Sequence, residues 1–351
     1  MSESLQKLGL VPFFTQQLAD TDLLQNCLGR VTSVQRSKST VVCDAGERTV
    51  ELSSTLRQSA AIDRPTVGDW IVMDESLSRI ERVLDRKSLF KRVGAGRSTE
   101  IQPIAANIDT LFIVTSCNEE FKESRLERYL TLCAEAGAVP VIVLTKTDLI
   151  DDTDTYVRRA RSIQAGVPVE IANALDSTTL DGVRAWIENI STVALVGSSG
   201  VGKSTLLNAL AGRSLATTSE IREQDKKGRH TTTHRELHLL PSGGLLIDVP
   251  GMRELKVADI DQSIGTVFKD IELLAKYCKF SDCKHESEPG CAVLQAIIEN
   301  KIDSRRLANY QKLQRENSLA TATLAEKRAQ GRDFAKMVKE VKLLKQKKGV
   351  T

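Results

Sequence analysis

Short apolar runs separated by turn residues fill residues 29–90. Four of them, GRVTSVQRSKSTVVCD, RTVELSS, VGDWIVMD and LSRIERVL, contain strand-forming residues, and Gly, Asp or Ser stand between them. Short strands at this spacing are typical of a small all-β barrel. The pattern therefore predicts a barrel over residues 25–98, which follows an N-terminal extension over residues 1–24.

A different pattern begins at about residue 104 and continues to residue 262. The apolar runs TLFIVTS, PVIVL, VPVEIA, TVALVG and LLIDVP alternate with helical stretches such as KESRLERYLTLCAEAG. This alternation is typical of a parallel sheet with helices on both faces, so we expect an α/β domain. Residues 263–325 are charged and predicted to be helical, and the Lys-rich residues 326–351 are expected to form a basic tail that is disordered when free.

The bulk composition is that of a globular protein with more than one domain. The chain has 351 residues and a net charge of +3, which does not by itself predict a polyanion-binding protein. Basic residues nevertheless gather in two stretches: residues 79–97 hold seven basic and two acidic residues, and residues 321–351 hold nine and three. Either stretch can contact a phosphate backbone or form an ordinary solvated surface.

The pattern of apolar and basic residues indicates neither a secretion signal nor a membrane span. No run approaches the roughly 20 apolar residues of a membrane span, and the start MSESLQKLGL has no basic segment followed by an apolar one. We therefore expect a cytoplasmic protein with no membrane partner. Seven cysteines in such a protein favour thiols or a metal site over disulfides.

The segment GSSGVGKST matches G-x-x-x-x-G-K-[ST] and stands between a strand-like and a helix-like run. Backbone N–H groups of such a loop point at phosphates, while Lys203 is expected to reach the β and γ oxygens and the Ser204 hydroxyl to bind Mg²⁺. A plain glycine turn is the alternative. The predicted phosphate-binding residues are Gly197, Ser198, Ser199, Gly200, Val201, Gly202, Lys203, Ser204 and Thr205.

Two downstream segments fit the switches of a nucleotide hydrolase. Asp248 ends a strand-like run and is placed to hold Mg²⁺ through water, while the N–H of Gly251 is placed to sense a γ-phosphate. The polar residues 217–233 contain few core-forming side chains, as expected of a loop that the γ-phosphate orders. One hydroxyl at the end of this segment is expected to bind Mg²⁺: that of Thr231, Thr232 or Thr233.

The segment TKTD follows the strand-like run PVIVL. One carboxylate, here Asp148, can accept both the N1–H and the N2–H₂ donors of guanine, while the stem of Lys146 lies over the ring. A second base loop is expected at EIANAL, where backbone N–H groups can reach the base oxygen. The predicted base-binding residues are Thr145, Lys146, Thr147 and Asp148 in the first loop, and Asn173 and Ala174 in the second.

These base loops precede the phosphate loop, whereas the usual order along such chains is the reverse. A doubly wound sheet tolerates this permutation because the site requires only that its loops meet at the carboxyl ends of the strands. The predicted order is base loop, second base loop, phosphate loop, switch I and switch II. In this order switch II leads directly into the C-terminal region, so a nucleotide-dependent shift can be passed to it.

Three cysteines and one histidine stand within the fourteen-residue segment CKFSDCKHESEPGC. Cys278, Cys283, His285 and Cys291 offer three soft thiolates and one imidazole, a closed tetrahedral set suited to one structural Zn²⁺. Four protein ligands leave no open coordination position, so we expect a structural site that stabilises the fold and not a zinc hydrolase. Iron–sulfur ligation and free thiols are the alternatives.

Together, these motifs resemble those of the circularly permuted GTPases of the RsgA family, which assist late maturation of the small ribosomal subunit. The resemblance covers nearly everything after residue 25 and rests on VGDW, IAANIDT, TKTD, GSSGVGKST, GRHTTT, DVPGMRE and CKHESEPGCAV. It implies an RNA-binding OB-type barrel, a permuted P-loop GTPase domain and an α-helical zinc-binding C-terminal domain. It also implies Zn²⁺, Mg²⁺ with GTP, and the 30S subunit with its 16S rRNA as partner and activator.

Several positions depart from the usual GTPase pattern. Thr145 stands where the base loop usually has Asn, so guanine affinity is expected to be lower, and Asn173 replaces the usual serine of the second base loop. Met252 follows Gly251 where many GTPases place a glutamine that positions the attacking water, and a thioether cannot do this. His230 is similar to the replacement proposed for the family and is the candidate catalytic residue; a solvated loop histidine is the alternative.

From the sequence we predict a monomeric GTPase whose intrinsic hydrolysis is slow and is accelerated when the small subunit orders switch I. Two other functions remain open at this point. One is a GTP-gated RNA-binding regulator in which hydrolysis is incidental, and the other is an ATP-using remodelling enzyme.

Overall fold

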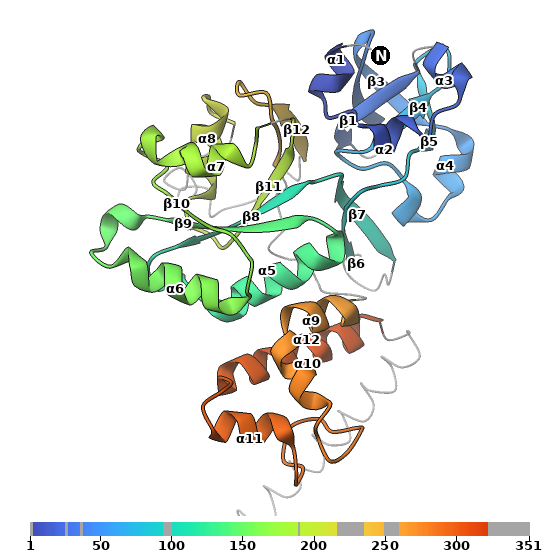
Figure 1. The fold of residues 1–351 in the computed structure, drawn as a ribbon. Helices are drawn as coiled ribbons and strands as arrows, with labels where there is room; N and C mark the ends of the chain where they lie inside the picture. Colours follow the sequence, from blue (N-terminus) through green and yellow to red (C-terminus); the bar gives the residue numbers. More distant parts are fainter. Residues whose placement is uncertain are drawn as a thin grey trace, which may run out of the picture.

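The computed structural model describes residues 3–24, 27–35, 38–93, 100–188, 190–215, 235–248 and 260–321. The chain starts with three short helices, α1 (Glu3–Lys7), α2 (Pro12–Thr15) and α3 (Asp20–Leu24), which lie beside the barrel (Figure 1). Leu5 and Phe14 are buried, and the Phe14 ring centroid lies 5.8 Å from that of Trp70 in the barrel. This extension is therefore part of the packed core.

Five strands form a closed barrel: β1 (Leu28–Gln35), β2 (Lys38–Cys43), β3 (Gly46–Leu52), β4 (Trp70–Met73) and β5 (Arg79–Val83). Their order is β1-β2-β3-β5-β4, and closure follows because β1 pairs with both β2 and β4. The short elements α4 (Ser54–Gln58) and η1 (Ala61–Asp63) connect β3 to β4. The interior is filled by Val31, Val41, Val50, Ile71 and Ile80. The barrel predicted from the apolar runs is confirmed.

The strands of the α/β domain have the order β10-β9-β8-β11-β13-β12. Its parallel strands are β8 (Thr110–Ser116), β9 (Val139–Thr145), β10 (Val169–Ala172), β11 (Thr192–Val196) and β13 (Leu245–Asp248), and β12 (Glu236–Leu239) is antiparallel to β13. Every residue of β8 and β11 is buried. This explains why these strands are continuous apolar runs in the sequence, since a parallel sheet is covered on both faces.

Helices cover both faces of this sheet (Figure 1). On one face, α5 (Glu123–Ala136) and α6 (Thr153–Ile163) share a core with Leu111 and Ile113 of β8. On the other, η3 (Ser177–Leu180), α7 (Asp181–Ala185) and α8 (Lys203–Ala211) share a second core with Phe112 and Val114. Successive side chains of one strand thus enter different cores, as the twofold period of a strand requires.

The barrel and the α/β domain share one continuous sheet. Glu236 of β12 pairs with Ser33 of β1, so the two parts form a single 11-stranded sheet. A separate hairpin of β6 (Leu89–Val93) and β7 (Ile101–Ala106) leads from the barrel into β8. The connection is therefore made by backbone hydrogen bonds as well as by the chain itself.

Arg30 of β1 is buried at this junction. Its guanidinium donates hydrogen bonds to the carbonyl of Gly68 at 3.2 Å and to the hydroxyl of Thr192 at 2.9 Å, and also contacts the carbonyl of Leu8. Burial lowers the pKa of Arg30 to about 10, so the side chain remains a cation near neutral pH. One charge thus links the N-terminal extension, the barrel and β11.

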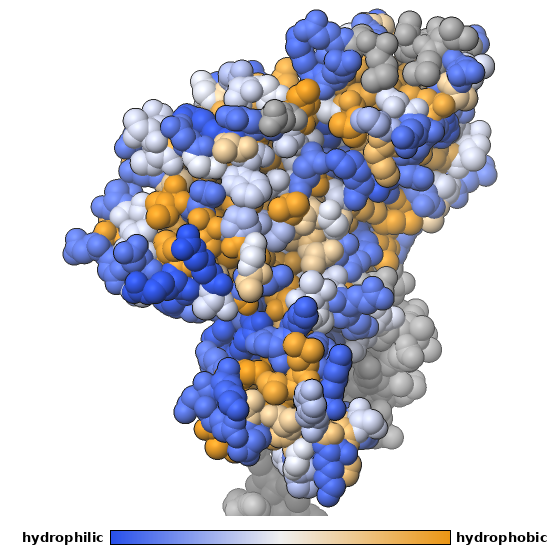
Figure 2. Space-filling view, viewed as in Figure 1, coloured by the Kyte–Doolittle hydropathy of each residue, from blue (hydrophilic) through white to orange (hydrophobic). Residues whose placement is uncertain are grey.

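The C-terminal part consists of helices α9 (Asp261–Val267), α10 (Lys269–Ala275), α11 (Ala292–Ile298) and α12 (Ser304–Thr321). It packs against α5 of the α/β domain (Figure 1), and Figure 2 shows apolar side chains between hydrophilic ones on its visible face. Within the described ranges, no helix has both the length and the apolar character needed to cross a membrane. The predicted multidomain architecture, with a barrel, an α/β domain and a helical C-terminal domain, is confirmed.

Candidate functional site

The expected ligand-binding edge lies where β8 and β11 are neighbours. From β8 the chain moves outward to β9 and β10, whereas from β11 it moves to the opposite side, so the connections diverge at this point. Open α/β sheets bind ligands at such a switch point, beyond the carboxyl ends of the strands. The strand register brings these carboxyl ends together. Thr145 of β9 pairs with Ser116 of β8 and with Ala172 of β10, and Val196 of β11 pairs with Ile113 of β8.

The predicted phosphate loop occupies residues 197–202, between β11 and α8. A Cβ atom at Gly197 would lie 2.2 Å from the carbonyl oxygen of Val114, so only glycine fits there. Gly200 and Gly202 have φ angles of 76° and 93°, which side chains rarely adopt. Lys203 begins α8, and its ammonium donates to the carbonyl of Ser198 within the loop.

Ser204 and Thr205 occupy the first turn of α8, as the sequence motif predicts. The free N–H groups and the positive dipole end of a helix favour an anion at this place. Lys203 adds a full positive charge beside it. The local arrangement is therefore suited to a polyphosphate.

The predicted base loop follows β9. Lys146 adopts a left-handed conformation with φ of 57°, and the short helix η2 (Thr147–Leu149) comes next, with Asp148 exposed. The second base loop follows the adjacent strand β10. There the carboxamide oxygen of Asn173 accepts a hydrogen bond from the N–H of Leu175 at 3.0 Å, and Ala174 lies between them. The Asn173 side chain therefore stabilises the conformation of its own loop.

The two principal loops are in direct contact. Thr145 is buried, and its hydroxyl lies 2.6 Å from the carbonyl oxygen of Val201 in the phosphate loop and 3.2 Å from that of Thr115 in β8. The hydroxyl has one proton and therefore donates principally to the nearer oxygen, that of Val201. The base loop and the phosphate loop are consequently held side by side, whatever their order along the chain.

Asp248 ends β13 and is paired across the strands with Glu236 of β12. Ile247 is level with Ala194 of β11, so Asp248 lies at the same edge of the sheet as the phosphate loop. The remaining predicted switch and catalytic residues lie outside the described residues: His230, Thr231, Thr232, Thr233 and Gly251.

Arg125 is a site neighbour that the sequence analysis missed. It stands in the first turn of α5, and its guanidinium donates to the Ser198 hydroxyl in the phosphate loop and to the Glu120 carboxylate at 2.8 Å. Hydrogen bonding from Arg125 lowers the pKa of Glu120. The sequence could have indicated this residue, because Arg125 lies in the first turn of the helix after β8, and β8 is next to β11, the strand that leads into the phosphate loop.

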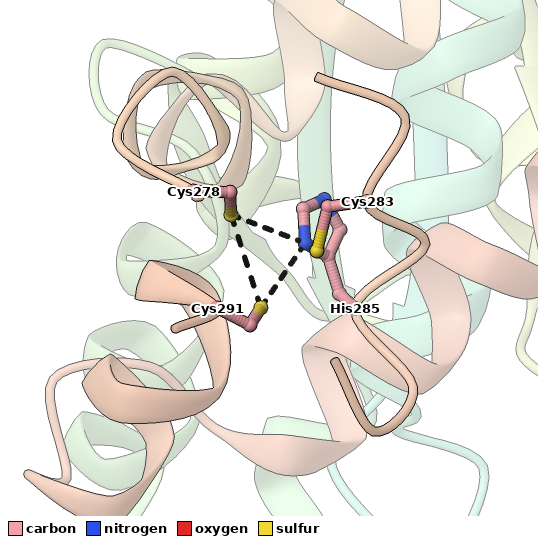
Figure 3. A group of neighbouring side chains, drawn as sticks. All are labelled: Cys278, Cys283, His285 and Cys291. Atoms are coloured by element: carbon pink, nitrogen blue, oxygen red, sulfur yellow. Dashed lines mark hydrogen bonds between the residues drawn. The ribbon is translucent and has the colours of Figure 1, made fainter. Parts of the chain in front are cut away.

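The four predicted metal ligands come together in the C-terminal domain, and their side chains point toward one another (Figure 3). Their ligand atoms all lie within 4.8 Å of one another. The Sγ atoms of Cys278 and Cys291 are 3.8 Å apart, and Nδ1 of His285 lies 3.6 Å and 3.3 Å from them. Cys283 completes the group.

These spacings fit a tetrahedral zinc ion. Bonds of about 2.3 Å to sulfur and about 2.0 Å to nitrogen require sulfur atoms about 3.8 Å apart and sulfur–nitrogen separations of about 3.5 Å. The separations of 3.8, 3.6 and 3.3 Å are close to these values. The cluster is therefore shaped for a metal ion, and a disulfide is not formed between any of its cysteines.

The surrounding backbone holds this cluster in place. Cys291 is the N-cap of α11, and its sulfur accepts from the N–H of Leu294. The Glu288 carboxylate accepts N–H groups of the loop between the ligands, and the Gln311 amide of α12 donates to the carbonyl of His285 at 3.2 Å. The cluster thus connects the loop of residues 278–291 to two helices.

Comparison with known proteins agrees with this geometry. The family model described as RsgA GTPase matches residues 83–258. A second family model, described as ABC transporter, matches residues 180–348, a stretch that includes the phosphate loop. The phosphate loop is common to many nucleotide-binding families, and this second match covers less than half of the chain.

Curated relatives match almost the whole chain. "Small ribosomal subunit biogenesis GTPase RsgA 2" of Vibrio parahaemolyticus is 46% identical, over 99% of this chain and 95% of that protein. "Small ribosomal subunit biogenesis GTPase RsgA" of Mesorhizobium japonicum is 44% identical, over 90% of each. Among solved structures, YjeQ from Thermotoga maritima is 28% identical with a TM-score of 0.60, over 82% of this chain and 96% of that one. YloQ, described as a circularly permuted GTPase, has the same fold at 23% identity and a TM-score of 0.55, over 84% of this chain and 96% of that one.

Proposed function

The chain belongs to the RsgA GTPase family, and from this premise we propose that it is a GTP-hydrolysing assembly factor of the small ribosomal subunit. The observation that carries the proposal is the hydrogen bond from Thr145 to Val201, because it joins the predicted base loop to the predicted phosphate loop. A nucleotide of ordinary length can then contact both. The names of the curated relatives support the ribosomal partner.

In this proposal Asp148 accepts the N1–H and N2–H₂ groups of guanine, and the stem of Lys146 lies over the ring. Thr147, Asn173 and Ala174 complete the base pocket. At the other end, residues 197–205 enclose the phosphates, with Lys203 on the β and γ oxygens. Ser204 binds Mg²⁺ directly and Asp248 holds it through water.

Hydrolysis requires a group that orients water at the γ-phosphate. We assign this role to His230 because Met252, after Gly251, cannot do it. One of Thr231, Thr232 and Thr233 binds Mg²⁺ when switch I is ordered. Slow intrinsic turnover and acceleration by the subunit follow, since ordering of this segment is the step that the partner assists.

The metal proposed for Cys278, Cys283, His285 and Cys291 is one structural Zn²⁺. Three thiolates and one imidazole prefer zinc among the common divalent ions, and four protein ligands leave no position for catalysis. Its effect is on folding: the ion joins α11 and the preceding loop to α12. Freshly purified protein should contain about one zinc per chain by elemental analysis. Protein that is folded and zinc-free would contradict the assignment.

In this proposal each part of the chain has its own role. Residues 1–24 extend the barrel of residues 25–98, which contacts 16S rRNA; residues 104–262 bind GTP; residues 263–325 bind zinc; and residues 326–351 are a basic tail. The protein acts as a cytoplasmic monomer on the 30S subunit.

Single-turnover hydrolysis of GTP, with and without purified small subunits, tests this function. We expect slow hydrolysis alone and a large increase with subunits, and the same assay with ATP should give little product. Binding to subunits without acceleration would favour a GTP-gated RNA-binding regulator. Equal use of ATP would contradict the base assignment.

A further inference from the structure

Arg125 contacts the phosphate loop from a different part of the fold. It stands in the first turn of α5, and its Nη1 atom donates to the hydroxyl of Ser198, 73 positions later in the chain. The same nitrogen donates to the Glu120 carboxylate at 2.8 Å. An Nη atom of arginine carries two N–H bonds, so it can serve both acceptors at once. The carboxylate therefore orients the guanidinium, and the guanidinium holds the serine.

The phosphate loop is held at both of its ends. Arg125 holds Ser198 near the start, and the Thr145 hydroxyl lies 2.6 Å from the carbonyl oxygen of Val201 near the end. Thr145 ends β9, and Arg125 lies on the helix between β8 and β9. Glycines give the loop backbone more freedom than other residues would, so contacts from outside the loop select its conformation.

Ser198 receives a second cation at its backbone. The Lys203 ammonium donates to the Ser198 carbonyl, and in the proposed function it has to leave this oxygen to reach the β and γ phosphates. Arg125 binds the hydroxyl and not the carbonyl, so its contact is independent of that movement. Ser198 therefore keeps one fixed partner while Lys203 changes from a protein acceptor to the ligand.

The helix that carries Arg125 is itself held by the C-terminal domain. The Asn309 amide of α12 donates to the carbonyl of Ser124 at 3.2 Å and to the carboxylate of Glu127 at 2.5 Å. Ser124 and Glu127 stand on either side of Arg125 in the chain. A side chain that positions a loop needs a support of this kind, because its own placement has to be defined.

We propose that Arg125 is a positioning residue of the phosphate loop: through the Ser198 hydroxyl it fixes the start of the loop in the conformation that binds the β-phosphate. The inference rests on the proposed function, in which the ligand is a guanine nucleotide. Glu120 pairs with Arg125, so the arginine contributes hydrogen-bond geometry and not attraction of the ligand. A loop that is ordered in advance loses less entropy when the nucleotide binds.

The affinities of Arg125→Gln, Ser198→Ala and the double variant for GTP and GDP test this role. Each single variant should bind GTP and GDP about fivefold more weakly, because both nucleotides carry the β-phosphate. The double variant should bind as each single one does, since both changes remove the same contact. The matched control is Arg128→Gln, on the same helix, where the arginine pairs with Glu316 of α12. It should bind both nucleotides as the wild type does.

Glu120→Gln separates positioning from an effect of charge. In this variant Arg125 keeps its charge but loses the carboxylate that orients it. If Arg125 positions the loop, GTP affinity should fall about twofold to fivefold. Higher GTP affinity of Glu120→Gln, or weaker GTP binding by Arg125→Gln with GDP binding unchanged, would overturn the proposal. Either result would show that the arginine acts on the phosphates through its charge.

Thermal stability and steady-state hydrolysis separate this role from a general effect on the fold. The Arg125–Glu120 pair is partly exposed, so the Tm of Arg125→Gln should stay close to that of the wild type. Its KM for GTP should rise with the Kd while kcat changes little. A lower Tm with unchanged nucleotide affinity would overturn the proposal. Ser198→Ala keeps the Arg125–Glu120 pair, so it tests the role even if Arg125→Gln does not fold.

Parallel titrations with ATP distinguish failure of this inference from failure of the proposed function. If the wild type binds ATP as tightly as GTP and Arg125→Gln weakens both, the positioning role stands and the guanine specificity fails. If the wild type binds GTP selectively and the variants bind it equally well, the positioning role fails and the function stands. A wild type that binds neither nucleotide would contradict both.

Discussion

The hydroxyl of Thr145 donates a hydrogen bond to the carbonyl of Val201 over 2.6 Å, between residues 56 positions apart in the chain. Thr145 ends the strand before the base loop, and Val201 lies inside the phosphate loop. Both residues are buried, and the bond holds the predicted base loop beside the predicted phosphate loop. The two loops are therefore in contact although their order along the chain is permuted.

Thr145→Val tests this link with nearly the same side-chain volume. The buried carbonyl loses its donor, which costs about 1 kcal/mol or more, and GTP should bind about five- to tenfold more weakly. Thr145→Ser keeps the hydroxyl and should bind GTP as the wild type does. Equal GTP affinity of all three proteins in isothermal titration would show that the bond does not organise the site.

A buried carboxylate joins the α/β domain to the C-terminal domain. Glu127 of α5 has no exposed surface and accepts from Arg305 at 3.1 Å, Arg306 at 2.9 Å and the Asn309 amide at 2.5 Å. Glu127→Gln removes the charge and leaves two arginines without their shared partner. Breaking a buried pair in this way costs about 3 kcal/mol, which urea denaturation measures.

The matched control for that variant is Glu316→Gln. Glu316 pairs with Arg128 of the same helix α5, but both side chains are partly exposed. Such pairs contribute at most about 1 kcal/mol. Similar losses for the two variants would mean that the buried position of Glu127 adds nothing to the interface.

The turn between β4 and β5 contains a pH-dependent contact. The Asp74 carboxylate accepts from the Ser76 hydroxyl at 2.7 Å and from the N–H groups of Ser78 and Arg79 at 2.8 and 3.0 Å. Burial opposes ionisation, but these bonds outweigh it and lower the pKa of Asp74 from 3.8 to about 2. Since the folded pKa is the lower one, the stabilisation is full above pH 3.8 and is lost as the pH falls toward 2.

Asp74→Asn should therefore destabilise the protein by about 1 kcal/mol at pH 7. The difference from the wild type should shrink as the pH falls through the range given by those two pKa values, because the wild-type carboxylate is then protonated. Urea unfolding of both proteins at several pH values measures the gap. If the difference in unfolding free energy between the two proteins stayed constant in acid, the effect would come from hydrogen-bond geometry and not from the charge of Asp74.

Much of the architecture could be predicted because it depends on local patterns. The parallel strands are continuous apolar runs since both sheet faces are covered, and the phosphate loop is recognisable because its glycines and Lys203 must follow a strand and begin a helix. The cysteines and His285 lie within one short segment, so their convergence requires little of the rest of the fold. For these features, neighbours in the chain are also neighbours in space.

Other features depend on contacts that no local pattern contains. Glu127 looks like one more charged residue of an amphipathic helix, and its arginine partners stand 178 and 179 positions later. Thr145 was predicted to belong to the base loop and to replace an Asn, whereas its bond to Val201 could be seen only from the order of the strands. The basic stretch of residues 79–97 was counted by charge, and only the fold shows that Arg82, Arg86, Lys87 and Lys91 have carboxylate partners.

The central claim is that one guanine nucleotide spans the site from Asp148 to Lys203, and the affinity of Asp148→Asn for xanthosine and guanosine triphosphates tests it most directly. Xanthine has a carbonyl where guanine has its amino group, so an asparagine amide can donate where the aspartate accepted. We predict that the variant prefers xanthosine triphosphate, with GTP affinity about ten- to 100-fold lower. Asp151→Asn, a change at an exposed position of the same loop, should keep the preference for GTP. An Asp148→Asn protein that still preferred GTP would contradict the account.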